Sequence, residues 1–185
     1  MNPLVEKLKK LRTCSEALEW IGAYEDEQKA WDECPNGAWL LWYCGRSPGS
    51  VDDPRRKKLA TASLAVVRLA PPCKDEKAEA IRQNCLVVLE KWIRDEATTE
   101  DLRRAAADVA DVADVADAAD ATANAAYAAV TANAGAAAAY ADAAADAVAV
   151  AVAHDAWEKT YKKTLALEAD EVRKVYPQPP PCIFE

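Results

Sequence analysis

Apolar residues recur at helical spacing along most of the chain, and no stretch alternates as a half-buried strand would. Between residues 74 and 94 one face carries Ala78, Ile81, Cys85, Val88, Leu89 and Trp92. Phenylalanine occurs once, and β-branched residues are sparse apart from short valine clusters. We therefore predict an all-α protein, a single-domain helical bundle.

Start and stop signals divide the first part into short helices. Residues 13–16 read Thr-Cys-Ser-Glu, a capping box that predicts a helix over 14–21, ended by Gly22. A second helix is expected over 26–34, closed by the Pro-Asn-Gly turn at 35–37. Residues 38–44 are apolar nearly all round, which predicts a helix in the centre of the fold.

Two longer helices follow. Asp53-Pro54 predicts an N-cap and first turn for a helix that runs to about Leu69. Its first turn is basic (Arg55, Arg56, Lys57, Lys58), which is unfavourable at the positive end of the helix dipole and indicates an external acidic neighbour. Residues 74–94 form the next helix. The core is predicted to be held by the six tryptophans: Trp20, Trp31, Trp39, Trp42, Trp92 and Trp157.

The second part is alanine-rich. Thr98 or Thr99 caps a helix, and the one plausible interruption in the alanine run is Asn133-Ala-Gly135. We expect a hairpin of two long helices over 99–133 and 136–174, followed by an extended proline-rich tail. The single domain, 1–185, would thus comprise a Trp-rich part (1–98), an Ala/Asp-rich part (99–176) and a tail (177–185).

Charge is distributed very unevenly along the chain. Residues 1–104 hold 18 basic and 18 acidic side chains, whereas residues 105–185 hold 5 and 13, so the net charge of −8 comes from the second part. From Ala105 to Glu158 there is no lysine or arginine, but there are eight aspartates and one glutamate. Such a surface repels nucleic acid and anionic membranes and attracts basic proteins.

The aspartates of this run are the candidate protein-binding residues. Five recur every three residues, so at about 100° per residue they wind around the helix and form no single stripe. The candidates are Asp108, Asp111, Asp114, Asp117, Asp120, Asp142 and Asp146. The alternative is that they only keep an alanine-rich helix soluble.

Signatures of catalysis and of metal or cofactor binding are lacking in the sequence. His154 is the single histidine and has no accompanying nucleophile at a familiar spacing. The six cysteines are scattered without a CxxC pair, so free buried thiols are expected and zinc is not. There is no glycine-rich phosphate loop. We predict that the chain is not an enzyme and needs no cofactor.

Targeting signals are also missing. Residues 1–12 mix Leu4, Val5, Leu8 and Leu11 with charged residues, unlike the apolar core of a signal peptide. Aspartates interrupt the alanine run too often for a membrane span. A cytoplasmic protein without a membrane or nucleic-acid partner is expected.

A family resemblance covers nearly the whole chain. Residues 30–42 read AWDECPNGAWLLW and follow CSEALEW at 14–20. Ala80-Ile81, Trp92, the start at Thr99, the alanine run and the closing VRKVYP at 172–177 come in the same order as in bacterial immunity proteins of the Imm5-like kind, which this sequence resembles. Two departures are Ala38, where an aspartate is usual, and a diluted alanine and cysteine cluster at 59–64.

The resemblance implies a small cytosolic protein that binds and neutralises a toxin, and many such toxins are basic nucleases. The acidic surface agrees with that function. Two alternatives stay open: a DNA-mimicking or anti-defence inhibitor of a mobile element, and a structural or scaffold helical protein. Trp39 and Trp42 are interpreted as core anchors and not as contact residues.

Overall fold

The computed structural model describes residues 2–46, 53–113 and 157–181, and in these ranges the protein is all-α, without a strand. This confirms the predicted fold class. The helices are α1 (Pro3–Lys10), α2 (Ser15–Ile21), α3 (Glu27–Glu33), α4 (Gly37–Cys44), α5 (Pro54–Val67), α6 (Glu76–Ile93), α7 (Thr99–Ala113) and α10 (Trp157–Val175).

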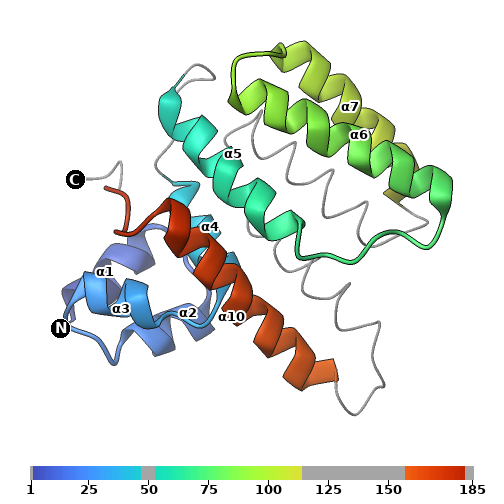
Figure 1. Ribbon diagram of the computed structural model, residues 1–185. Helices are drawn as coiled ribbons and strands as arrows, with labels where there is room; N and C mark the ends of the chain where they lie inside the picture. The colour runs from blue at the N-terminus through green and yellow to red at the C-terminus, as the bar shows by residue number, and fades with distance from the viewer. Residues whose placement is uncertain (1, 47–52, 114–156, 182–185) are drawn as a thin grey trace.

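The helices pack in a row, with the short ones at one end (Figure 1). α7 packs against α6, α6 against α5, and α5 against α10, which also packs against α4. α1 and α2 contact each other and lie with α3 beside the C-terminal half of α10. The turn expected at 133–135 and most of the alanine run lie outside the described residues.

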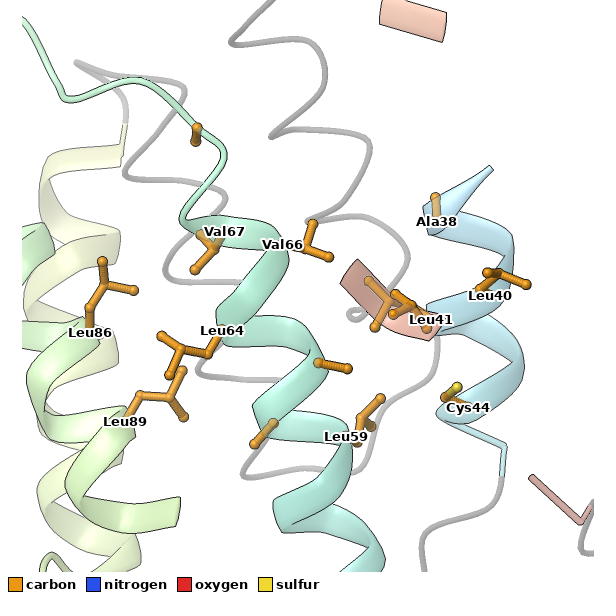
Figure 2. Packing of buried hydrophobic residues seen from close by; sticks show 14 of the residues in the cluster. Ala38, Leu40, Leu41, Cys44, Leu59, Leu64, Val66, Val67, Leu86 and Leu89 are labelled. Atoms are coloured by element: carbon orange, nitrogen blue, oxygen red, sulfur yellow. The ribbon is translucent and has the colours of Figure 1, made fainter. Parts of the chain in front are cut away.

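The core is centred on α5, which is buried on two sides. Leu64 points toward Leu89 of α6, whereas Leu59 faces α4, from which Leu41 points inward (Figure 2). Because both flanks of α5 are covered, its apolar residues do not form a single stripe. The largest fully buried side chains include Leu41, Leu59, Leu89, Leu102, Val66, Val67, Val109 and Val172.

The predicted tryptophan core is confirmed for two of its six members and is wrong in making tryptophans the centre of the core. Trp31 and Trp92 are buried, but Trp20, Trp39 and Trp42 are only half-buried. The aliphatic residues of α5, α6 and α7 fill the centre instead, since these longer helices bring more apolar area together than the short Trp-rich ones can. The side chain of Trp157 lies outside the described residues.

Helix starts agree closely with the sequence signals. The side chains of Asp53 and Asp75 accept hydrogen bonds from Arg55 N (2.9 Å) and Ala78 N (2.7 Å). Thr98 and Asp101 form a reciprocal capping box: Asp101 N donates to Thr98 Oγ1 (3.1 Å) and Thr98 N donates to Asp101 Oδ2 (3.0 Å).

The capping box predicted at 13–16 does not form. α2 begins at Ser15 with Cys14 at the N-cap position and no side-chain cap. The Thr13 hydroxyl instead donates to Leu8 O (2.9 Å) at the end of α1. The Thr13 side chain, which the sequence pattern places at the start of α2, thus bonds to the end of α1.

The basic first turn of α5 has its acidic neighbours within this chain. Lys57 forms an ion pair with Asp95, which follows α6. Arg55 forms an ion pair with its own N-cap, Asp53 (2.5 Å). The external neighbour predicted for this turn is therefore another part of the same protein.

Gly37 allows α4 and α10 to approach closely. A Cβ atom at Gly37 would lie 2.4 Å from Cβ of Glu168 and 2.8 Å from the backbone nitrogen of Ala169. Both of these α10 residues are fully buried. The glycine read as part of a turn is in fact the first residue of α4, where the absence of a side chain makes room for α10.

Helices α1 and α6 both end in a residue with a left-handed backbone that is not glycine. Arg12 has a φ of 60° and Asp95 a φ of 64°. At α1, Thr13 N donates to Leu8 O (3.3 Å) and Arg12 N to Lys9 O (3.0 Å), the pair of bonds of a Schellman motif. An L-residue here costs about 1 kcal/mol relative to glycine.

We expect Gly37→Ala to lower the free energy of unfolding by about 3 kcal/mol, because backbone atoms of α10 must shift to admit the methyl group. Urea denaturation followed by circular dichroism measures the change. Gly22→Ala is the control, since its nearest contacts would be 3.2 Å or more away and Gly22 is exposed. Equal losses in the two variants would contradict the close-approach explanation.

Arg12→Gly should raise the free energy of unfolding by about 1 kcal/mol, since glycine adopts the left-handed conformation without a steric penalty. Arg12→Ala keeps the Cβ atom and should give no such gain. Thermal and urea unfolding of both variants distinguish these outcomes. A similar gain for alanine would show that the arginine charge, and not the backbone, is responsible.

Candidate functional site

Two of the seven predicted binding aspartates lie in the described residues, and both are on the outer face of α7. Asp108 and Asp111 are exposed. The opposite face of α7 is buried and consists of Leu102, Ala105, Ala106 and Val109. Asp114, Asp117, Asp120, Asp142 and Asp146 lie outside the described residues.

Asp108 also marks where α7 meets α6. Burial of the Cys85 thiol on α6, and secondly the charge of Asp108, raise the pKa of Cys85 to about 12. The carboxylate of Asp108 is thus near the seam between the two helices while remaining accessible to solvent.

Basic side chains of the first part pair with carboxylates that are not on the acidic stretch of α7. Lys57 pairs with Asp95, Arg68 with Glu90, and Arg82 with Glu79 (2.8 Å). The exposed Arg94 pairs with Glu96 (3.0 Å) and Arg173 with Asp170 (2.8 Å). None of the ion pairs found within the described ranges includes Asp108 or Asp111.

The first turns of α7 are not acidic overall. Arg103 and Arg104 are exposed, and Arg103 lies 3.5 Å from Glu100. These are the last cations before Lys159 in the sequence. The candidate acidic surface therefore begins at Asp108 and continues toward the C-terminal end of α7.

A second feature, which the sequence did not indicate, is an aromatic pocket among α1, α2, α3 and α4. Its volume is about 370 Å³, and Pro179 of the C-terminal tail also lines it. Five of its lining residues are aromatic: Trp20, Trp31, Trp39, Trp42 and Tyr43. The rings of Trp20 and Trp39 lie 6.1 Å apart between centroids.

This pocket modifies the interpretation of Trp39 and Trp42 as core anchors, since Trp39 packs against the core and also lines the pocket. Both side chains line the hollow and are half-buried. The sequence signal was available: α4 has eight residues and carries three aromatic rings, more than one short helix can bury on its inner face.

One carboxylate in the pocket wall is already bonded. Glu27 Oε1 accepts hydrogen bonds from Tyr43 Oη (2.6 Å) and Lys7 Nζ (3.0 Å), and Glu27 Oε2 accepts from Lys7 Nζ (3.1 Å). Lys7 Nζ also lies 5.6 Å from the centroid of the Tyr43 ring. The negative charge of Glu27 is thus compensated by Lys7 from α1.

The tail is attached to α3 next to this pocket. Trp31 Nε1 donates to Tyr176 O (2.9 Å), and Arg173 Nη1 donates to Cys34 O (2.8 Å). Gln28 Nε2 donates to Pro177 O (3.1 Å). These bonds hold the wall that contains Pro179 in place.

The cysteines in the described ranges are free, as predicted, although they are not all buried. Cys34, Cys44 and Cys85 are buried, Cys73 is half-buried and Cys14 is exposed. Burial raises the pKa of Cys34 to about 11, which makes its thiolate scarce at neutral pH. Cys14 is therefore the most accessible of these thiols.

Glu79→Gln should lower the free energy of unfolding at neutral pH by about 2 kcal/mol, because it leaves the buried Arg82 without its anionic partner. The hydrogen bonds that Arg82 donates to Glu79 are the main cause that lowers the pKa of Glu79 to about 2. An unfolded glutamate titrates near 4.3. The stabilisation is therefore complete above about pH 5 and is lost as pH falls toward 2.

Urea denaturation between pH 2 and 7 measures this effect. The free energy of unfolding should depend less on pH in Glu79→Gln than in the wild type. Glu96→Gln, which removes the exposed partner of Arg94, is the control and should change stability little. Parallel pH profiles for wild type and Glu79→Gln would contradict the role given to this pair.

The described residues contain no group of three or more His, Cys, Asp or Glu side chains placed to share a metal ion. No helix in the described ranges combines the length and apolarity needed to cross a membrane. No family model, curated protein or solved structure matches this chain. A function must therefore be argued from the exposed carboxylates of α7 and the chemistry of their surroundings.

Proposed function

We propose that this protein is an immunity-type inhibitor that binds a basic protein toxin through the acidic surface beginning at Asp108 and Asp111 of α7. The observation that carries the proposal is the exposure of both carboxylates without an ion pair to any cation in the described residues. Uncompensated charge on a rigid helix is available to a partner of opposite sign.

The ion pairs that arginines form elsewhere in the described residues support this proposal. A carboxylate partner lies no more than three positions away in the sequence for each of three arginines, Arg82, Arg94 and Arg173. These three arginines are thus paired away from Asp108 and Asp111, and the exposed Arg103 and Arg104 lie at the start of α7 beside Glu100 and Asp101. Of the excess negative charge of the second half of the chain, Asp108 and Asp111 are the two carboxylates that the described part of α7 carries, and both face solvent.

Rigidity also supports binding. The inner face of α7 is fixed on α6 by Leu102, Ala106 and Val109, which are fully buried. A preorganised surface loses little conformational entropy when a partner binds. Oriented carboxylates on such a surface would speed association with a basic cleft and would make it sensitive to salt.

The toxin as partner is inferred from the resemblance of residues 30–42 and of the order of motifs to bacterial immunity proteins. Blocking the basic cleft of a nuclease would neutralise it without any chemistry on the part of the inhibitor. An inhibitor protein that is encoded by a mobile element and blocks a nucleic-acid enzyme would use the same surface. The identity of the protein that binds separates these two cases.

The test is calorimetric titration with the product of the adjacent gene at about 50 and about 300 mM salt. We expect binding that weakens as salt rises. Asp108→Asn with Asp111→Asn should weaken binding about tenfold, which corresponds to about 1.4 kcal/mol for the two charges. Co-expression with the toxin should then protect cells less well than the wild type does.

Glu19→Gln with Glu25→Gln is the matched control. Both glutamates are exposed and far from α7 in the sequence, and the net charge changes by the same amount. This control should bind as the wild type does. Unchanged affinity in the α7 variant, or no binding at low salt, would refute the proposal and leave a structural role for the helix.

A further inference from the structure

We propose that the aromatic pocket among α1–α4 binds a small aromatic anion, with the ring system packed against the tryptophan side chains of the wall and the anionic group on Arg12. The volume of about 370 Å³ lies in the range of small-molecule sites. This site is separate from the α7 surface, so either proposal can fail without the other.

The walls of the pocket are suited to a flat apolar body. Trp20, Trp39 and Trp42 are half-buried around the hollow, and Leu4, Leu8 and Ile21 line it as well. The Trp20 and Trp39 rings are inclined by 53° to each other at 6.1 Å, an arrangement with room for further edge or face contacts. Aromatic and aliphatic walls together favour a ring system over a flexible chain.

Hydrogen-bond donors in the walls remain available. The indole N–H of Trp31 is used, because it donates to Tyr176 O (2.9 Å). Those of Trp20, Trp39 and Trp42 donate to no residue in the ranges that the structure describes. Half-buried indole donors around a cavity favour a ligand that brings acceptor atoms.

The charge of the pocket is positive once its internal ion pair is counted. Lys7 and Glu27 neutralise each other, with Nζ 3.0 Å from Oε1. Arg12 also lines the pocket, is exposed, and forms no ion pair within the described ranges. A guanidinium beside an apolar hollow selects a carboxylate, sulfonate or similar anion.

The experiment uses anilinonaphthalene sulfonate as the anionic probe. N-phenylnaphthylamine is the neutral control, because it has the same rings without the sulfonate. We expect one sulfonate probe per folded chain, energy transfer from tryptophan to the bound probe, and an affinity about tenfold higher than that of the neutral compound.

Arg12→Gly is the informative variant, since its expected stability is higher and a loss of binding cannot come from unfolding. The tenfold preference for the sulfonate should disappear in Arg12→Gly and largely persist in Arg12→Lys. Lys10→Gln is the charge control. Lys10 is the exposed last residue of α1 and does not line the pocket, so this variant should keep the preference for the sulfonate.

Cys14 reports the position of the probe. It is exposed and lies in the pocket wall, so a saturating probe should slow its alkylation at least severalfold, as followed by peptide mass mapping. The proposal is overturned if sulfonate binding does not saturate, if both compounds bind the wild type equally, if Arg12→Gly keeps the preference, or if Cys14 reacts at an unchanged rate.

Discussion

The seat of α10 between α4 and α5 is the packing on which the other elements depend. At Gly37 the two backbones come so close that a methyl group would not fit, since Ala169 N lies 2.8 Å from where a Cβ would be. Farther along, Lys58 of α5 lies 4.4 Å from the centroid of the Tyr176 ring. Removing α10 would uncover the faces of α4 and α5 that pack against it, and the aliphatic core of the protein would be open on one side.

The protein separates its two interaction chemistries in space. α1–α4 provide aromatic rings and a guanidinium around a hollow, whereas α7 provides the two exposed carboxylates of Asp108 and Asp111. α5 and α6 lie between them and hold the aliphatic core (Figure 2). Local ion pairs such as Arg82 with Glu79 keep the charges of this central part from acting on either surface.

How far the sequence could predict the structure depended on whether a feature was local. Capping at Asp53 and Thr98 was predictable because the interacting atoms lie within three residues. The role of Thr13 was not, because its hydroxyl had two competing partners, an amide at the start of α2 and the carbonyl of Leu8 at the end of α1, and it bonds to the carbonyl. The pocket and the half-burial of Trp39 depend on which helices meet, and the spacing of apolar residues contains no such information. The exposure of Asp108 and Asp111 was predictable from the helical period alone.

The bonds between α3 and the end of α10 have a consequence for how the chain is made. The Trp31 to Tyr176 hydrogen bond joins residues 145 positions apart. At ordinary ribosomal speeds, α4 and α5 therefore wait on the order of ten seconds for the last helix to emerge. During that interval the faces of α4 and α5 that pack against α10 lack their native cover, so the nascent chain offers chaperones an apolar surface that the finished protein conceals.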